Sequence, residues 1–590
     1  TALTGSVEIP VPEYFNGTIR LLAVAVGGDK LGFASSQSIA QQDFVIEPQL
    51  PYFVSPGDEF EVGATVANTV VGSGADVQLA IKVIPPESFE ALETKPILLT
   101  VPEGQDQSFR VRMKAGSLPG EQEIRFVAEG IGKITGASET ISVRPAHPFR
   151  TSLQTGIYRP DKDGDNAEKH LSPTRTLYPQ LRRVTASISQ SPLSLGRALM
   201  GYLKEYPYGC TEQLVSVAFP AVIFGTNEDF GLSNEDVKRF TSRAFQVLSA
   251  RQLADGSFAM WDGMYESDPL FSVYATHFLL EGSKRQLEIP TIVLERATKW
   301  VKDFSAEPKY ELPLQLAKAY ALYLQTQSGT VVSKEALAFQ QDLDRQWGTD
   351  WRESAIALFL AGAFSSMKMD EQAKALLKAP PEVWKGDAPW PLSDAALYGA
   401  IYSWISSKHF SADTWLSPLD TVIPLERMIR DKSLYSFNAS FAILGLSAAA
   451  ERMPELQSKA LRIAAETASK ETLPLEVLGK TLLAASVPES AAHLQFSGEA
   501  GKIFFFGLEE SGFDSDTPQP IAAGVSLHRE LKNGAGEMKA AFSLNEKVEV
   551  TLFLKAEKGA NQVAVVELIP GGFEVDLSDE GLANRRSLHE

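Results

Sequence analysis

The chain has 590 residues, of which 44% are hydrophobic and 22% are charged. One hydrophobic core does not organise so long a chain, so we expect several domains. The formal net charge is −19, from 55 lysine and arginine residues and 74 aspartate and glutamate residues. This charge opposes attraction to nucleic acid or to an anionic membrane surface, and we exclude nucleic acid as a partner.

No apolar run in the sequence approaches the length that crosses a bilayer. The chain starts at Thr1 without an initiator methionine and without a basic-then-apolar leader. We therefore expect either a processed product or a cut portion of a longer protein, with any targeting information upstream of these residues.

Strand patterns dominate the first 145 residues. Residues 18–25 and 33–40 predict two strands, which we interpret as the end of a β domain. A new series follows Pro48, with alternating apolar and polar residues or many β-branched side chains, and with Gly, Pro, Asn and Asp in the gaps. Short strands without intervening helices predict an antiparallel β-sandwich. The segments of this series are 58–70, 77–84, 97–101, 108–113, 121–128 and 138–144.

The apolar spacing becomes helical between Pro192 and about residue 488. About ten to twelve helices with short connections predict stacked helical hairpins. The segment from Gln252 to Phe258, Gln-Leu-Ala-Asp-Gly-Ser-Phe, resembles loops of α/α-toroid proteins, in which helical hairpins close into a ring. The clearest helix patterns are 236–251, 271–282, 291–304, 311–327, 334–345, 353–364, 393–406, 436–450 and 455–468.

Strand patterns return after residue 490, and residues 150–190 before the helices carry them as well. We therefore expect the helical block to be inserted into a β domain. The later predicted strands are 492–496, 502–507, 522–530, 538–556 and 562–575. The last two are too few to complete a sandwich before Glu590, so we expect the chain to be cut at this end too.

The single cysteine, Cys210, excludes an intramolecular disulfide. Such a thiol is either a small buried apolar group or a reactive sulfur. Cys210 lies on a turn before a predicted helix, 211–225, and Gln213 follows three residues later. Residues i and i+3 share one face of a helix, so the sulfur can approach the side-chain carbonyl of Gln213. If the sulfur attacks that amide and ammonia leaves, a thioester closes. Its carbonyl is an electrophile for amines and hydroxyls, because a thiolate leaves more readily than an amine.

Gly-Cys-x-Glu-Gln, from Gly209 to Gln213, resembles the thioester motif of the α2-macroglobulin and complement C3 family. The preceding Tyr-Pro-Tyr resembles the bacterial branch of that family. The resemblance implies a multidomain α+β fold of antiparallel β-sandwich domains with an inserted α/α-toroid thioester domain. The implied domains are the end of a macroglobulin-like β domain (1–45), a macroglobulin-like β-sandwich (46–146), a CUB-like β domain in two parts (147–190 and 490–532), the α/α-toroid thioester domain (191–489) and the start of a C-terminal macroglobulin-like or receptor-binding-like domain (533–590).

The same resemblance implies a function. Such a protein is no enzyme but a broad-spectrum protease inhibitor. After a protease cuts a bait region, which lies outside this chain, the thioester binds the attacker covalently through its surface lysines. No cofactor and no metal is implied. For the bacterial branch the resemblance further implies a periplasmic protein held at the inner membrane by an N-terminal lipid absent from this chain, and an association with a peptidoglycan synthase.

The resemblance also implies roles for single residues. Cys210 supplies the thioester sulfur and Gln213 the acyl carbonyl, and Gly209 allows a backbone geometry that a side chain would block. Glu212 either moves a proton and orients the ring, or is a solvated charge on the first helical turn.

Tyr206 and Tyr208 are candidates for shielding the thioester from water, with simple packing as the alternative. Met260 and Trp261 are weaker candidates, for which core packing is the better interpretation. His277 lies on an apolar segment and is interpreted as a core histidine. None of the seven histidines lies in a segment that matches the acyl-accepting histidine of some complement relatives, and without such a residue direct reaction with lysine is expected.

Three other interpretations remain. An α/α-toroid enzyme, such as a terpene cyclase, needs an acidic motif, and Asp342-Leu343-Asp344 offers only a pair of carboxylates. A cysteine hydrolase would pair Cys210 with a histidine base. A structural homologue without a formed thioester would act only by engulfing proteases.

Overall fold

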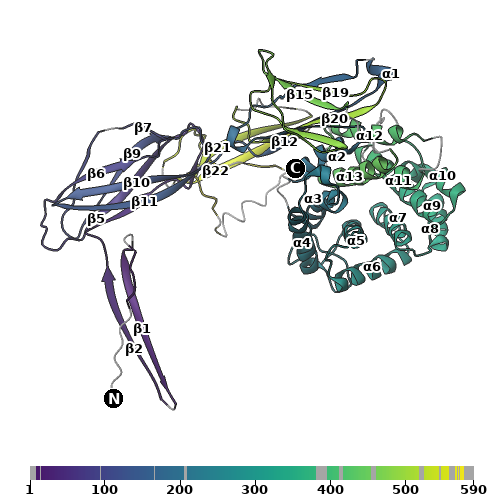
Figure 1. Ribbon diagram of the computed structural model, residues 1–590. Helices are drawn as coiled ribbons and strands as arrows, with labels where there is room; N and C mark the ends of the chain where they lie inside the picture. Colours follow the sequence, from purple (N-terminus) through teal and green to yellow (C-terminus); the bar gives the residue numbers. More distant parts are fainter. Residues whose placement is uncertain are drawn as a thin grey trace. The chain divides into compact units, whose positions relative to one another are not determined.

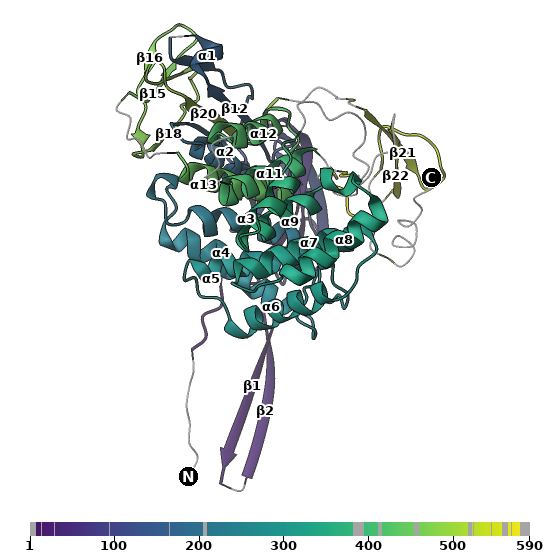
Figure 2. The same ribbon diagram turned by 90° about the vertical axis from the view of Figure 1, so that its right-hand side faces the viewer.

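The computed structural model divides into two compact units, one made of Thr1–Pro148 with Ser515–Glu590 and the other of Phe149–Asp514. Figures 1 and 2 show both units from two directions. None of the described helices is both long and apolar enough to cross a membrane. The described residues are 8–12, 15–28, 30–93, 95–164, 166–204, 209–380, 395–410, 416–453, 460–516, 522, 524–543, 546–556, 565–567, 569–570, 572–576 and 578.

Two hairpins belong to the first unit. Strands β1 (Gly17–Gly27) and β2 (Lys30–Ala40) pair antiparallel along their whole length, from Gly17 opposite Ala40 to Gly27 opposite Lys30. Strands β21 (Val525–Asn533) and β22 (Val548–Ala556) pair in the same way. The second hairpin confirms a strand at 522–530 and the later part of the strand predicted at 538–556.

A β-sandwich forms the core of the first unit. Its sheets have the strand orders β4-β11-β10-β6-β8 and β3-β5-β9-β7. Along β9, Phe109, Val111 and Met113 point into the core while the residues between them are exposed, as the period of two predicts. The predicted antiparallel sandwich is confirmed, apart from the short parallel pair β4–β11. The strands are β3 (Phe44–Gln49), β4 (Phe53–Val54), β5 (Glu59–Asn68), β6 (Gln78–Ile84), β7 (Glu90–Ala91), β8 (Ile97–Thr100), β9 (Asp106–Lys114), β10 (Gly120–Gly130) and β11 (Lys133–Val143).

The second unit combines a ring of helices with an interleaved β domain. The two sheets of that domain have the orders β12-β20-β14-β18-β17 and β13-β19-β15-β16, so each sheet combines strands from before and after the helices. The helical block is therefore an insertion. The short helix α1 (Pro160–Asp163) accompanies the strands β12 (Arg150–Tyr158), β13 (Glu168–Leu171), β14 (Arg183–Ser189), β15 (Arg462–Glu466), β16 (Thr472–Leu473), β17 (Val477–Leu478), β18 (Leu482–Ser486), β19 (His493–Ser497) and β20 (Phe504–Gly512).

The helix predicted at 455–468 is wrong. Residues 462–466 form strand β15, which pairs with β19 and places Ile463 opposite Phe496. Ile463 and Ala465 face the core of the β domain, and their neighbours are more exposed. Alanine-rich segments have high helix propensity, but pairing with a partner strand overrides this weak local preference. The strands of the β domain consequently resume near residue 462, before the predicted boundary at 490.

The helices form six hairpins within the described residues. One helix of each hairpin belongs to an inner layer, whose members contact one another in the cyclic order α3, α5, α7, α9, α11, α13 and again α3. This closed ring, visible in Figure 1, confirms the predicted α/α-toroid. The helices are α2 (Leu193–Lys204), α3 (Thr211–Phe224), α4 (Asn234–Arg251), α5 (Pro269–Lys284), α6 (Thr291–Ala306), α7 (Leu312–Gln327), α8 (Ser333–Trp347), α9 (Ala355–Ser366), α10 (Asp370–Leu376), α11 (Ala395–His409), α12 (Pro418–Arg430) and α13 (Ser436–Glu451).

Burial separates the two layers of the ring. The outer helix α6 buries one stripe, Val293, Ala297, Val301 and Ser305, spaced by four residues. The inner helix α9 is buried on all sides from its first residue to Phe364. Helices α2 and α12 also pack against β12, which joins the ring to the β domain (Figure 2).

Candidate functional site

Cys210 is the N-cap residue of α3, at the start of an inner helix of the ring. Its Sγ accepts a hydrogen bond from the backbone N–H of Gln213 at 3.4 Å. In return the backbone N–H of Cys210 donates to Oε1 of Gln213 at 3.2 Å. This reciprocal capping box satisfies two backbone donors at the helix end. It also brings the sulfur and the amide carbonyl of Gln213 to the same turn, as the spacing of three predicted.

The thiol of Cys210 is only 6% exposed. Burial raises its pKa, because a thiolate loses hydration there, and the charge of Glu212 acts in the same direction. The backbone N–H groups of Gln213 and Glu212 and the charge of Arg251 oppose this rise in pKa. The free thiol is consequently protonated at neutral pH, while groups that favour a thiolate surround it.

Glu212 is buried, with 8% of its surface exposed. Ser216 donates to its Oε1 at 2.7 Å, and Ser436 from α13 donates to its Oε2 at 3.0 Å. Burial raises the pKa of this carboxyl, although both serine hydrogen bonds lower it. The interpretation of Glu212 as a solvated charge is therefore wrong, because α13 closes over the first turn of α3.

A hydrogen-bond chain continues from Glu212 into the centre of the ring. The hydroxyl of Ser216 lies 2.9 Å from that of Tyr274 on α5, which donates to Ser440 on α13 at 2.5 Å. All three of these side chains are buried. Glu212 is thereby tied to two other inner helices of the ring.

Hydrogen bonds join the first turn of α3 to residues 252–260, which follow α4 and are called the toroid loop below. The N–H of Thr211 donates to the carbonyl of Met260 at 3.0 Å, and its hydroxyl donates to the carbonyl of Ala259 at 2.6 Å. Arg251, the last residue of α4, donates from Nη1 to the carbonyl of Gly209 at 3.0 Å. Gly209 and Thr211, on the two sides of Cys210, are thus held by the last residue of α4 and by the residues that follow it.

A family model described as the alpha-2-macroglobulin family matches residues 2–83. An alpha-2-macroglobulin homolog of Yersinia pestis is 27% identical over 584 residues, which cover 96% of this chain and 29% of the relative. Alpha-2-macroglobulin of Rickettsia conorii is 27% identical over 595 residues, with 96% and 30% covered. The chain is thus similar to members of the alpha-2-macroglobulin family over most of its length. It spans about a third of the length of these curated relatives.

Solved structures of bacterial alpha-2-macroglobulins have the same fold. The native Escherichia coli protein matches with a TM-score of 0.65 at 18% identity, covering 92% of this chain and 34% of that one. Salmonella alpha-2-macroglobulin reacted with methylamine matches with a TM-score of 0.63 at 20% identity. A native Escherichia coli structure that spans domain MG7 to the C-terminus has a TM-score of 0.63 at 17% identity, covering 87% of this chain and 81% of that one.

The structure also bears on the other candidate residues. Tyr206 and Tyr208 lie outside the described residues. No described atom lies within 4 Å of a Cβ built on Gly209, and its φ is outside the left-handed range, so the described residues show no steric need for glycine at this position. Trp261 is 49% exposed, with the guanidinium of Arg251 5.8 Å from its ring centroid, so the core-packing interpretation of Trp261 is wrong.

His277 lies among the aromatic side chains at the centre of the ring, as predicted. Its Nδ1 is 2.7 Å from the hydroxyl of Tyr320, and its ring stacks on Trp404. Its Nε2 lies 3.8 Å from Oε1 of Glu281, which exceeds hydrogen-bond distance. Burial lowers the pKa of His277 to about 4, so the ring is neutral near pH 7.

The acidic pair Asp342 and Asp344 forms ion pairs on α8. Asp342 pairs with Arg345, and Asp344 pairs with Arg352 and accepts a hydrogen bond from the indole of Trp351. Both carboxylates are occupied at the outside of the ring. They offer no acid for an α/α-toroid enzyme.

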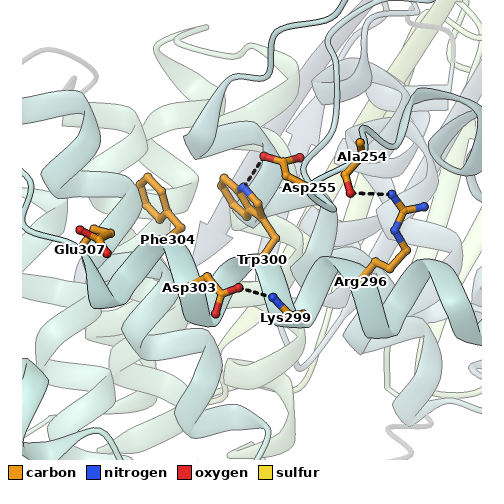
Figure 3. Close-up of a pocket in the computed structure, with 8 residues that line it drawn as sticks. All are labelled: Ala254, Asp255, Arg296, Lys299, Trp300, Asp303, Phe304 and Glu307. Carbon is orange, nitrogen blue, oxygen red and sulfur yellow. Dashed lines mark hydrogen bonds and ion pairs between the residues drawn. The ribbon is translucent and has the colours of Figure 1, made fainter.

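The toroid loop also borders a surface cavity of about 500 Å³. Figure 3 shows the stacked rings of Trp300 and Phe304 along α6, with Asp255 accepting a hydrogen bond from the indole of Trp300 at 3.1 Å. Lys299 and Asp303 pair at its rim. None of the residues from Gly209 to Gln213 lines this cavity.

Proposed function

We propose that this chain is the thioester-bearing part of a protease trap. In this proposal the Cys210 sulfur and the Gln213 side chain form an internal thioester. An attacking protease that has cut a bait region elsewhere in the longer protein is then captured through a surface lysine. The observation that carries the proposal is the reciprocal hydrogen bonding of Cys210 and Gln213 on one buried helical turn.

Thioester formation is written as an internal acyl transfer. The sulfur of Cys210 attacks the side-chain carbonyl carbon of Gln213 while its proton passes to Glu212, and the amide nitrogen takes up the proton that Glu212 donates and leaves as ammonia. The backbone N–H of Cys210 already donates to the carbonyl oxygen of Gln213, so it is placed to stabilise the oxyanion that develops there. Glu212 is the proposed proton donor, because its raised pKa keeps a proton on the carboxyl closer to neutral pH.

In the capture step, residue 213 supplies the acyl group and the sulfur of Cys210 is the leaving group. A lysine amine attacks the acyl carbon of residue 213, the carbon–sulfur bond breaks, and the electron pair leaves with the sulfur as thiolate. An amide to the protease remains. The raised pKa of the buried Cys210 thiol favours its protonation after release, which removes the nucleophile that could reverse the step.

A periplasmic location with an N-terminal lipid tether at the inner membrane, and an association with a peptidoglycan synthase, belong to the same proposal. Their support is the resemblance of the sequence to bacterial alpha-2-macroglobulins. Fractionation of cells that produce the full-length protein tests the location. Recovery in the cytoplasmic fraction would contradict it.

Methylamine tests the proposed chemistry. It should add to residue 213 of the wild-type chain, raise the mass by one methylamine and release one titratable thiol per chain. Cys210→Ala and Gln213→Glu are the matched variants, because each removes one partner of the thioester. An equal mass gain in either variant contradicts the assigned roles. A wild-type thiol that is fully titratable before methylamine is added favours the homologue without a formed thioester.

A further inference from the structure

Arg251 is a buried cation beside the candidate thioester, and the sequence does not single it out. Its residue surface is 8% exposed, at the last position of α4. Nη1 donates to the carbonyls of Gly209 and Met260 at 3.0 and 3.1 Å, and Nε pairs with Asp262 at 2.8 Å. A guanidinium taken out of water is costly unless its donors are used, and here Nε and Nη1 have acceptors.

The contacts of Arg251 fall on both neighbours of Cys210. Besides the carbonyl of Gly209, Nη1 lies 3.3 Å from the hydroxyl of Thr211. The same hydroxyl and the N–H of Thr211 are bonded to the toroid loop at Ala259 and Met260. One side chain therefore contacts the backbone of Gly209 and the hydroxyl of Thr211, on the two sides of the sulfur, and also the carbonyl of Met260.

We propose that Arg251 is the positioning residue of the thioester reaction, where its guanidinium holds the turn around Cys210 in place and supplies the positive charge beside the departing sulfur. This inference rests on the proposed function. When an amine attacks the acyl carbon of residue 213, the electron pair of the broken carbon–sulfur bond moves to Sγ. A nearby cation in a site with little water stabilises that developing charge.

The electrostatic surroundings of Cys210 agree with this role. Burial and the charge of Glu212 raise the pKa of the thiol, whereas the charge of Arg251 and the N–H groups of Gln213 and Glu212 lower it. Cys210 and Glu212 belong to the first turn of α3, whereas Arg251 reaches the site from α4. Removal of the Arg251 charge therefore leaves the thiolate opposed by both burial and Glu212.

Arg296 provides a matched control. It is also an arginine of the toroid, and it donates to the carbonyls of Leu253 and Ala254 in the same loop region, at 2.6 and 3.1 Å. Its hydrogen bonds do not reach the described residues from Gly209 to Gln213. A loss that arises only from a loosened loop should appear in Arg296→Gln as well as in Arg251→Gln.

The experiment compares the wild-type chain with Arg251→Gln, Arg251→Lys and Arg296→Gln, after thermal unfolding has shown that each variant is folded. The first readout is the rate of thiol release by methylamine. The second is the pH midpoint at which the released thiol reacts with a small alkylating reagent. Arg251→Gln should slow release by about tenfold or more and move the midpoint to higher pH. Arg251→Lys should restore much of the midpoint but not the full rate, because lysine lacks the planar fork.

Arg296→Gln should behave as the wild-type chain in both readouts. Unchanged rate and midpoint in Arg251→Gln, or an equal loss in Arg296→Gln, would overturn the positioning role. If the wild-type chain releases no thiol with methylamine because the thiol is already free, the proposed function fails. The alkylation midpoint then still tests the charge of Arg251 by itself, so the two failures are distinguishable.

Discussion

Both carboxyl oxygens of Glu212 accept hydrogen bonds from serine hydroxyls, one on its own helix and one on α13. Burial raises the pKa of this carboxyl. The folded chain therefore binds the proton more tightly than the unfolded chain does. Stability should fall as pH rises from the unfolded pKa through the folded pKa, and it should be regained on acidification across the same interval.

Two replacements of Glu212 distinguish the role of its proton from the role of its hydrogen bonds and packing. Glu212→Gln keeps an acceptor for one serine and should change the free energy of unfolding by less than about 1.5 kcal/mol at neutral pH. Glu212→Ala leaves Ser216 and Ser436 without their acceptor and should cost about 1 to 3 kcal/mol. Urea unfolding of the three chains measures both values. Thioester formation, followed by methylamine-dependent thiol release, should be impaired in both variants, and normal release in Glu212→Gln would contradict a proton-transfer role.

The sequence predicts only the local part of the site. Cys210 and Gln213 lie together because three residues along a helix return to the same face, and this spacing is visible in the sequence. Ser436 and Arg251 are far from Cys210 in the sequence and reach it only through the closure of the ring. An arginine in the last turn of a helix is common for its interaction with the helix dipole, so its position gave no functional signal.

Gly256 occupies the turn of the toroid loop with φ +102°, and a Cβ built on it would lie 2.3 Å from the carbonyl oxygen of Arg296. Gly256→Ala should therefore lower the free energy of unfolding by about 3 kcal/mol or more. Gly263 has φ +77° with no atom within 4 Å of its built Cβ, so Gly263→Ala should lower it by only about 1 kcal/mol. Thermal unfolding compares the two variants. Equal losses would mean that the close approach of residue 256 to the carbonyl oxygen of Arg296 on α6 does not contribute to the loss of stability.

The buried ring of His277 on α5 should make the free energy of unfolding depend on pH. Burial lowers the pKa of His277 to about 4, below its ordinary value of 6.5. The unfolded chain then binds the proton first, so the free energy of unfolding should fall as pH drops from 6.5 toward 4, on the order of 1.4 kcal/mol per pH unit. His409, whose pKa burial lowers to about 3, acts in the same direction.

The variant His277→Gln should flatten this decline without abolishing it, because His409 still titrates. His170 is exposed and provides the control, so His170→Gln should retain the wild-type slope. Urea unfolding at pH 7, 6, 5 and 4 gives the slopes. A wild-type slope in His277→Gln would contradict the assignment of acid sensitivity to the ring centre.

Sequence periodicity predicts the helices of the ring well and one segment wrongly. Inner helices such as α9 are apolar on all sides, and outer helices such as α6 carry a stripe at a spacing of four, so both differ from strands. Residues 462–466 are short and alanine-rich, and only their pairing with β19 decides for a strand. The insertion of the ring into a β domain was visible as a change of pattern, whereas the strand order required the structure.

Arg175 ties the two parts of the interleaved β domain together. Its side chain is 10% exposed and pairs with Asp514, and it donates to the backbone carbonyls of Glu510 and Gly512. Burial alone would raise the pKa of Asp514, but Arg175 and Arg150 lower it. In the sequence, Arg175 precedes all helices of the ring, whereas residues 510–514 follow them.

Arg175→Met should lower the free energy of unfolding of the whole second unit by about 3 kcal/mol or more, because Asp514 and two carbonyls lose a buried partner. Lys299→Met, which breaks the exposed pair with Asp303, should cost far less. Denaturant unfolding followed by circular dichroism and tryptophan fluorescence measures both. If Arg175→Met lowers stability no more than Lys299→Met, the two-part domain is not held together at this point.

The intact mass of the freshly purified chain is the most direct test of the central claim, because a closed thioester changes composition without any added reagent. We expect the wild-type chain to be lighter than its encoded sequence by one ammonia, and Gln213→Glu and Cys210→Ala to show their full encoded masses. A wild-type chain at its full encoded mass, with a free Cys210 thiol, would show that no thioester has formed.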